Sequence, residues 1–311
     1  MTDTAPFRAD LADAPDGGKF VWRHADDGVR LRLGAWSADT PRGTVLLFPG
    51  RTEYIEKYGR VVRDLLAANW SVALLDWRGQ GMSDRLDDDA RLGHVDEFID
   101  YQRDLAAFLD WVAEMALPGP RVLLAHSMGG CIGLRALVDG LDVRRAVFSA
   151  PMWGIQMPAY ARPLTYVVPP MARLLKRETL FAPGTKPTSY LVDTAFHDNM
   201  LTTDATTFGW LCDQIAAEPE FALGGPSVQW VGSATQELKQ LFAAPKPALP
   251  CLTFVGSDEQ IVSVEAMERY HHGWPSGELR QVEGAKHEMM MEAPVIRDRF
   301  MTETLSFFAQ A

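Results

Sequence analysis

Cysteine and long apolar runs are scarce in this 311-residue sequence. Only three cysteines are present, Cys131, Cys212 and Cys251, and they lie far apart. Their odd number fits no disulfide framework and their spacing fits no zinc site, so we expect buried, reduced thiols in an intracellular protein. No uncharged stretch is longer than 16 residues, and the one at 146–161 is interrupted by two prolines and a glycine. A membrane-spanning helix needs about 20 apolar residues, so we expect none.

Basic residues are also in deficit. The 30 lysines and arginines are outnumbered by 41 aspartates and glutamates, which gives a net charge of −11, and they form no basic patch. Nucleic-acid binding depends on such patches, so we expect no nucleic-acid partner. Residues 84–110 hold nine acidic and three basic side chains, which we interpret as a solvated face. Residues 1–18 are acidic and lack the apolar core of a signal peptide, so we expect a cytoplasmic protein.

Hydrophobic residues make up 47% of the chain, as in an ordinary globular protein, and their order predicts the fold. Short, nearly continuous apolar runs are typical of parallel strands covered on both faces, and a 3.6-residue period is typical of the helices between them. The predicted strands are 20–24, 29–36, 44–48, 72–76, 121–126, 145–149, 250–256 and 279–282. The predicted helices are 58–69, 99–115, 128–139, 264–272 and 294–309. This alternation indicates an α/β protein with a mostly parallel, doubly wound sheet.

The alternation stops between residues 152 and 245. These 94 residues hold nine of the 20 prolines, 11 aromatic residues and only 14 charged residues. An insertion this late in a parallel sheet predicts a mainly helical cap over the carboxyl ends of the strands, where open α/β sheets bind ligands. We therefore expect an N-terminal tail (1–18), a core (19–151 and 246–311) and a cap (152–245).

The strongest local motif is LAHSMGG at 124–130, where a predicted strand turns directly into a predicted helix. This is the context of a nucleophile elbow, in which a serine in strained backbone lies between small residues. Ser127 is therefore the candidate nucleophile, and the helix that follows directs N–H groups at the site. The alternative is that Ser127 is only the N-cap of an ordinary helix.

Two later segments supply partners for this serine. His287 lies in the loop VEGAKHE (282–288), between the last predicted strand and the last helix. Asp258 and Glu259 follow the strand in FVGSDEQIV (254–262). A serine hydroxyl needs a neighbouring base, and the base needs an acid that fixes its tautomer. The order serine, acid, histidine is that of α/β-hydrolases, and all three positions follow strand ends.

Further motifs carry a family resemblance. They are DWRGQGMS at 76–83, GHVD at 93–96 with YQRDL at 101–105, and NMLTTD at 199–204. With them the chain resembles serine hydrolases of the α/β-hydrolase fold, in the group of monoacylglycerol lipases, bacterial lysophospholipases and serine aminopeptidase S33-like enzymes. The resemblance extends from about Lys19 to Phe308.

The resemblance implies the remaining site residues. The spacing Gly-x-x-acid-x-apolar-apolar of the group places the acid at Glu259, and Asp258 is the alternative. Many relatives carry His-Gly after the third strand, where this chain has Pro49-Gly50-Arg51. Because the oxyanion donors are backbone N–H groups, the resemblance assigns the oxyanion hole to Arg51 and Met128.

The implied function is hydrolysis of a monoacyl lipid ester through an acyl-enzyme, with a lysophospholipase as the first choice. The alternatives are a monoacylglycerol lipase or general carboxylesterase, and a peptidase or non-catalytic binding module. We expect no cofactor, no metal and no obligate protein partner.

One cap segment suggests two roles. Residues 159–175 are apolar and precede Lys176-Arg177. They could contact the inner face of a membrane transiently, with the basic pair at the head groups. Because three internal prolines disfavour a regular amphipathic helix, burial in the cap core is the preferred interpretation.

Overall fold

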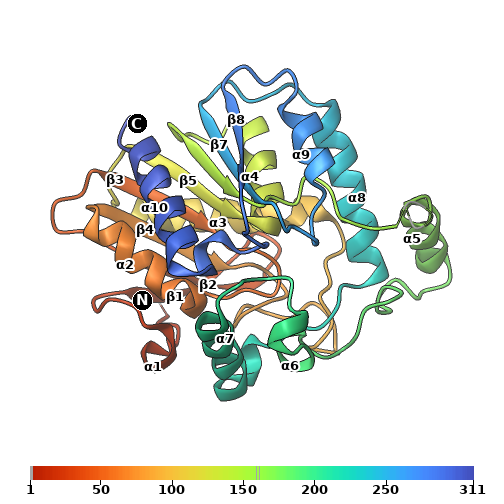
Figure 1. Ribbon diagram of the computed structural model, residues 1–311. Coiled ribbons are helices and arrows are strands. Elements are labelled where there is room, and N and C mark those ends of the chain that lie inside the picture. Colours follow the sequence, from red (N-terminus) through yellow and green to blue (C-terminus); the bar gives the residue numbers. More distant parts are fainter. Residues whose placement is uncertain (1–2, 159, 161) are drawn as a thin grey trace.

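The predicted alternation of strands and helices is found in the computed structural model, which describes residues 3–158, 160 and 162–311 (Figure 1). Its strands are β1 (Lys19–His24), β2 (Arg30–Trp36), β3 (Gly43–Phe48), β4 (Trp70–Asp76), β5 (Arg121–His126), β6 (Ala146–Ser149), β7 (Cys251–Gly256) and β8 (Gly277–Val282). Its helices are α1 (Ala9–Ala12), α2 (Gly59–Ala67), α3 (Tyr101–Glu114), α4 (Ser127–Val138), α5 (Leu164–Leu174), α6 (Tyr190–Asp193), α7 (Ala205–Ala217), α8 (Val228–Ala243), α9 (Val264–His271) and α10 (Pro294–Phe308). Short 3₁₀ turns are η1 (Ile55–Tyr58), η2 (Phe98–Asp100), η3 (Phe196–Asp198), η4 (Pro219–Phe221) and η5 (Met289–Met291).

Within the described residues, eight strands form one sheet in the order β1-β2-β4-β3-β5-β6-β7-β8. The hairpin β1–β2 joins β4 antiparallel, and every later neighbour is parallel. The predicted doubly wound α/β sheet is confirmed. The strand predicted at 72–76 begins two residues earlier, because Trp70 and Ser71 still pair with Gly43 and Thr44 of β3.

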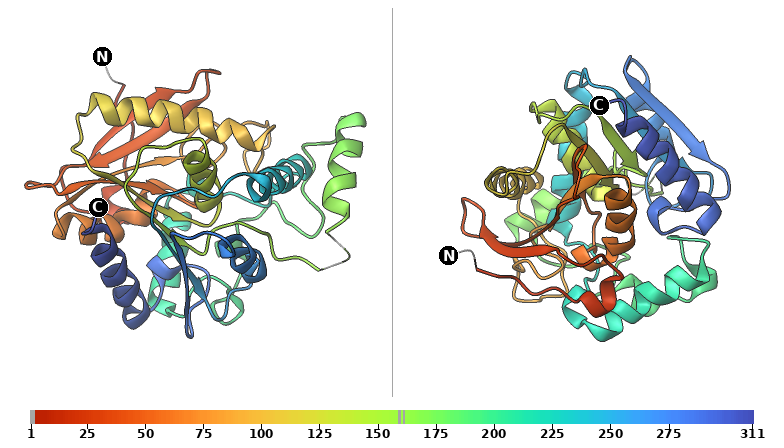
Figure 2. Two further views of the ribbon diagram at one scale, coloured as in Figure 1. Left: turned by 90° about the horizontal axis from the view of Figure 1, so that it is seen from above. Right: turned by 90° about the vertical axis from the view of Figure 1, so that its left-hand side faces the viewer.

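Both faces of the sheet are buried, which explains why the strands are nearly continuous apolar runs. In β3, Val45 and Leu47 pack with residues of α2 and α10, whereas Leu46 and Phe48 pack with residues of α3, α4, α8 and α9. Alternate side chains thus enter two separate cores. The helices accordingly lie in two layers around the sheet (Figure 2). This arrangement leaves the loops at the carboxyl ends of the parallel strands free to carry a site.

The segment between β6 and β7 holds α5, α6, α7 and α8. Of these, α8 packs against the core helix α4, where Arg135 Nε donates to Glu237 Oε1 at 2.5 Å. Helix α5 contacts α8 and projects from the rest of the molecule (Figure 1). The division into tail, core and cap remains a prediction. Within the described residues, no helix has the length and apolar character needed to span a bilayer.

The prediction that residues 159–175 are buried in a cap core is wrong for the part that the structure describes. Ala159 and Ala161 lie outside the described residues. Residues 164–174 form a helix even with Pro169 and Pro170 inside it. This helix touches α8 along one side only, where Pro169 lies so close that a Cβ on Gly232 would meet it at 2.5 Å. Most of the other apolar side chains of the segment face solvent, and Leu174 is 84% exposed, whereas Val168 and Ala172 are half-buried.

A fully buried ion cluster fixes the start of the sheet. The guanidinium of Arg32 in β2 donates from Nη2 to Glu56 Oε2 at 2.6 Å and from Nε to Asp76 Oδ2 at 2.8 Å. All three side chains are fully buried. Asp76 Oδ1 also accepts from the Ile55 N–H at 2.8 Å. The cluster therefore ties the end of β4 to the chain that follows β3.

This cluster predicts a large difference between two arginines of the same hairpin. Arg32→Met would leave two buried carboxylates without a counter-ion, and we expect it to lower the free energy of unfolding by about 3–5 kcal/mol. Arg23→Met in β1 removes an ion pair with the exposed Glu114 and should cost less than about 1 kcal/mol. Urea denaturation of both variants measures the difference. Equal losses would contradict a structural role for the buried cluster.

Candidate active site

Ser127 lies at the sharp junction between β5 and α4. Its φ angle is +48°, in the left-handed region that non-glycine residues rarely adopt. The glycines after it are required by close packing: a Cβ on Gly129 would lie 2.3 Å from the Phe48 carbonyl oxygen, and one on Gly130 would lie 2.5 Å from Pro151 Cβ. The motif thus encodes a strained turn in which a helix begins directly against the neighbouring strands.

The structure brings the three predicted catalytic side chains into one hydrogen-bonded chain. His287 Nε2 lies 3.0 Å from Ser127 Oγ, and His287 Nδ1 lies 2.8 Å from Glu259 Oε2. Ser127, Glu259 and His287 follow β5, β7 and β8, respectively, so the parallel sheet places them at one edge. Asp258 is instead exposed, and its carboxylate accepts from Ser257 Oγ. The structure therefore joins Glu259, and not Asp258, to the histidine.

The Glu259 carboxylate is held on both oxygens. Oε1 accepts from the N–H groups of Ile261 at 2.6 Å and Val262 at 3.1 Å, while Oε2 faces His287. Burial alone raises the pKa of Glu259, but attraction to His287 and these hydrogen bonds outweigh it, so the pKa lies below its ordinary value. The loop is also tied to the start of the cap segment: Ile155 forms a β-bridge with Val262, and the Gln156 N–H donates to the Ile261 carbonyl oxygen at 3.0 Å.

The proposed oxyanion donors lie on the loop after β3 and in the first turn of α4. No acceptor pairs with the Arg51 N–H in the described part of the chain. The side-chain amide of Gln80 holds the loop by donating from Nε2 to the carbonyl oxygens of Gly50 at 2.7 Å and Glu53 at 3.0 Å. Gln80 belongs to the DWRGQGMS motif, which therefore stabilises the oxyanion loop through these hydrogen bonds.

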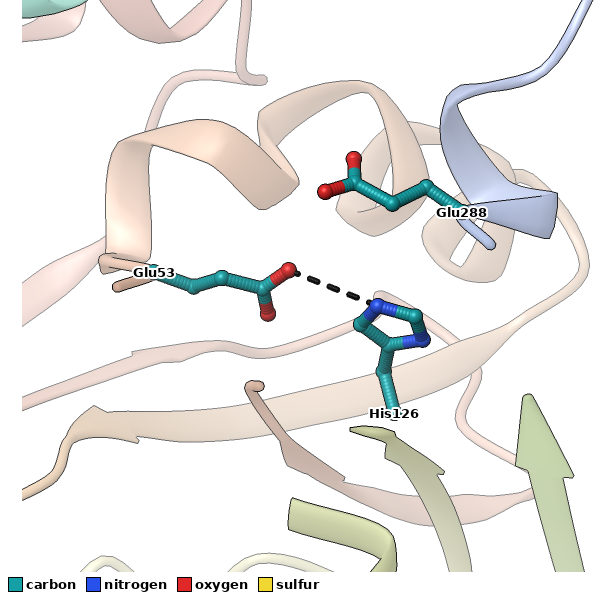
Figure 3. A group of neighbouring side chains, drawn as sticks. All are labelled: Glu53, His126 and Glu288. Atoms are coloured by element: carbon teal, nitrogen blue, oxygen red, sulfur yellow. Dashed lines mark ion pairs between the residues drawn. The ribbon is translucent and has the colours of Figure 1, made fainter. Parts of the chain in front are cut away.

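A buried polar cluster connects this loop to the serine and histidine loops (Figure 3). Lys57 Nζ donates to Glu53 Oε1 at 2.7 Å and to Glu288 Oε1 at 2.8 Å. His126, next to Ser127, places Nε2 3.6 Å from Glu53 Oε1. Glu53 also accepts from the Gly50 N–H and the Tyr58 hydroxyl. Residues of the oxyanion, serine and histidine loops thus belong to one polar network.

The charges in this cluster follow from burial. Burial opposes the charged forms of Glu53 and Lys57. Attraction to Lys57 outweighs burial for Glu53, whose pKa falls to about 2, and attraction to Glu288 and Glu53 outweighs it for Lys57, whose pKa rises. Burial lowers the pKa of His126 to about 4, so its imidazole is neutral at pH 7. Glu53, His126 and Glu288 lie close enough together to ligate a cation. The Lys57 ammonium already supplies positive charge to both carboxylates, so the residues do not require a metal.

A segment of the predicted cap packs on the histidine loop. The Met200 and Leu201 carbonyl oxygens accept from the N–H groups of His287 at 3.4 Å and Glu288 at 2.9 Å. Lys286 Nζ donates to the Asn199 carbonyl oxygen at 2.7 Å. The NMLTTD motif therefore positions the histidine. This motif is visible in the sequence, whereas no sequence signal distinguishes Lys57, and Gln80 is marked only by its place in the DWRGQGMS motif.

Ser127 and His287 line a cavity of about 320 Å³. Its apolar side chains come from both the predicted core and the predicted cap. Residues of the wall include Met152, Ile155, Leu191, Leu201, Trp230 and Val262. The nucleophile thus faces a largely apolar space of limited size, whose polar lining includes Glu53, Lys57 and Glu288.

The neutral His126 predicts a pH dependence of stability. Between about pH 6.5 and pH 4, the unfolded chain binds a proton at this imidazole that the folded chain does not, so stability falls as the pH falls through this window. In His126→Gln we expect the slope of unfolding free energy against pH to be shallower by up to about 1.4 kcal/mol per pH unit. Urea titrations at several pH values measure it, and an unchanged slope would refute the assignment.

Comparison with known proteins agrees with this geometry. Residues 39–294 match the family described as serine aminopeptidase, S33. Lysophospholipase L2 of Escherichia coli (strain K12) is 31% identical, over 92% of this chain and 88% of that protein. A probable lysophospholipase L2 of Haemophilus influenzae is 29% identical, over 82% of this chain and 80% of that protein.

A solved structure shares the fold. The soluble variant of monoglyceride lipase from Saccharomyces cerevisiae superposes with a TM-score of 0.76 at 17% identity, over 98% of this chain and 99% of that one. The predicted α/β-hydrolase fold and family resemblance are thereby confirmed. The chain belongs to the serine aminopeptidase S33 family of α/β-hydrolases.

Proposed function

We propose that this protein is a serine ester hydrolase of monoacyl lipids, in the first place a lysophospholipase. The observation that carries the proposal is the hydrogen-bonded chain Ser127–His287–Glu259 beside an apolar cavity. The relation to lysophospholipase L2 favours a lysophospholipid substrate. A monoacylglycerol lipase is the second candidate, favoured by the structural likeness to the yeast monoglyceride lipase.

In the first step, Ser127 Oγ attacks the ester carbonyl carbon while His287 Nε2 takes the hydroxyl proton. The negative charge that develops on the carbonyl oxygen is stabilised by the N–H groups of Arg51 and Met128. Glu259, held ionised, accepts from His287 Nδ1 and stabilises the imidazolium. His287 then gives its proton to the leaving alcohol, and the acyl group remains on Ser127.

In the second step, His287 takes a proton from water, whose oxygen attacks the acyl-enzyme. The same N–H groups stabilise the second tetrahedral intermediate, and Ser127 leaves with the proton that His287 returns. The fatty acid is released and the enzyme is regenerated. These residues perform both steps without a cofactor.

The cavity favours a single acyl chain. The proposed cap supplies Tyr190, Leu191, Met200 and Leu201 to its wall, which also includes Ser127 and His287. We therefore propose that residues 152–245 form a cap that covers the acyl group over the core 19–151 and 246–311. Burial of the chain between cap and core gives affinity in proportion to the apolar area removed from water.

We further propose a cytoplasmic protein that contacts the inner face of the membrane through α5. The exposed apolar side chains there include Tyr166, Val167 and Met171, each more than half exposed, and Lys176-Arg177 follows the helix. An apolar helix face beside basic residues is suited to the boundary between head groups and acyl chains. Such contact would bring the cap to the substrate.

The catalytic assignment is tested by neighbouring substitutions. We expect Ser127→Ala to abolish labelling by a fluorophosphonate and Glu259→Gln to lower kcat by about 10²–10⁴-fold, because the histidine loses the group that fixes its tautomer. Asp258→Asn is the matched control and should stay within about twofold of wild type. Labelling of Ser127→Ala, or a loss confined to Asp258→Asn, would overturn the assignment.

The substrate class is measured in the same preparations. Lysophosphatidylcholine, monoacylglycerol, p-nitrophenyl esters of increasing chain length and aminoacyl anilides are compared at equal enzyme concentration. Turnover of lysophosphatidylcholine and longer esters supports the proposal, whereas turnover of anilides alone would identify a peptidase.

Membrane contact is tested by vesicle sedimentation. Val167→Asp places a charge on the exposed face of α5, and we expect it to weaken binding at least about tenfold, since burying one valine contributes about 1.5–3 kcal/mol. Val295→Asp in α10 is the control, because this valine is 85% exposed on another helix. Equal binding by both variants would rule out a role for α5.

A further inference from the structure

The side chain of Arg51 is a cation without a counter-ion beside the catalytic serine. Nη2 donates to the Gly224 carbonyl oxygen at 2.7 Å, and the guanidinium lies 5.4 Å from the centre of the Trp230 ring. Its Nε is shielded from solvent and has no partner in the described part of the chain, where no carboxylate pairs with the guanidinium either. Arg32 and Arg78, in contrast, each contact a buried carboxylate.

An unpaired guanidinium in this position is unfavourable by itself. Burial lowers the pKa of Arg51 to about 10, which leaves it charged at neutral pH but poorly solvated. The group is also held in place, because a Cβ on Gly93 would lie 2.1 Å from Nη2. Buried charges in proteins are normally paired, so a fixed, unpaired cation in a cavity indicates an anionic ligand.

Arg51 lines two cavities. One is the catalytic cavity, and the second, of about 320 Å³, is also lined by Thr52 and Tyr190. Further residues of the second cavity are Thr185, Thr188, Lys186 and Asp193, of which Lys186 and Asp193 form an ion pair with each other. Arg51 is therefore the cation of this cavity that has no carboxylate partner in the described part of the chain, and guanidinium and hydroxyl groups are suited to phosphate oxygens.

We propose that the Arg51 side chain binds the phosphate of a lysophospholipid head group in this second cavity, while the acyl chain occupies the catalytic cavity. The inference rests on the proposed function and deepens it. The Arg51 N–H is the proposed oxyanion donor, so one residue would contact both the ester oxygen and the phosphate. In the lipid, the glycerol backbone lies between the ester carbonyl and the phosphate. In Arg51, the side chain lies between the backbone N–H and the guanidinium, and the number of covalent bonds is about the same in both cases.

This arrangement discriminates between the two candidate substrates. A monoacylglycerol carries a hydroxyl where a lysophospholipid carries the phosphate, so only the lysophospholipid neutralises Arg51. The anion could also be free phosphate, which shares this chemistry but lacks the glycerol and acyl groups. Selectivity and binding measurements together separate these sources.

The selectivity test compares lysophosphatidylcholine with monoacylglycerol of the same acyl chain. We expect Arg51→Gln to lower the ratio of their kcat/KM values by about 10–100-fold, since a charge-assisted hydrogen bond contributes about 1.5–3 kcal/mol. Arg51→Lys should restore part of the ratio. Arg85→Gln is the matched control: Arg85 donates to main-chain carbonyl oxygens and lines neither cavity, so the ratio should equal that of wild type.

Binding is measured by calorimetry with Ser127→Ala. We expect glycerophosphocholine to bind, and to bind at least tenfold more weakly when Arg51→Gln is added. Equal losses on both substrates in Arg51→Gln, or binding of inorganic phosphate alone, would overturn the inference. If the wild-type protein hydrolyses neither lipid, the proposed function is wrong, and the glycerophosphocholine measurement still decides whether Arg51 binds this head group.

Discussion

The loops of the active site depend on one buried ammonium group. Lys57 contacts Glu53, which binds the oxyanion loop, and Glu288, which is adjacent to the catalytic histidine. These groups are shielded from water, so the ammonium stabilises both carboxylates, and its loss would leave two buried acidic groups without a counter-ion. The positions of the loops are therefore interdependent. Acyl transfer requires this, because small displacements of the nucleophile, base or oxyanion donors are costly in rate.

The sheet and the cap contribute different parts of the site. Parallel strands bring the serine, acid and histidine to one edge although they lie far apart in the sequence, and the two cores make that edge rigid. The segment 152–245 supplies much of the cavity lining and, through Met200 and Leu201, also holds the backbone of the histidine loop. Substrate binding and catalytic geometry thus depend on the same contacts.

Much of the fold could be predicted from the sequence, because strands buried on two faces are almost purely apolar and few other structures share that pattern. Ser127 and His287 could be predicted because each follows a strand end in a distinctive motif, whereas the choice of Glu259 over Asp258 came from the residue spacing of the related group. Lys57 was not, since a lysine near the start of a helix resembles a solvated residue and its partner Glu288 is 231 positions away. The exposure of α5 could not be predicted either: the prolines of residues 159–175 disfavoured a regular amphipathic helix, and only the tertiary structure determines which apolar side chains are covered.

The β-bridge between Ile155 and Val262 restricts any movement of the proposed cap. Val262 and Ile261 donate the hydrogen bonds that hold Glu259, and the bridge fastens the first residues of segment 152–245 to them. A movement of this segment that included Ile155 would pull the acid away from the histidine. A movement that preserved the contact between Glu259 and His287 would therefore have to begin beyond Gln156.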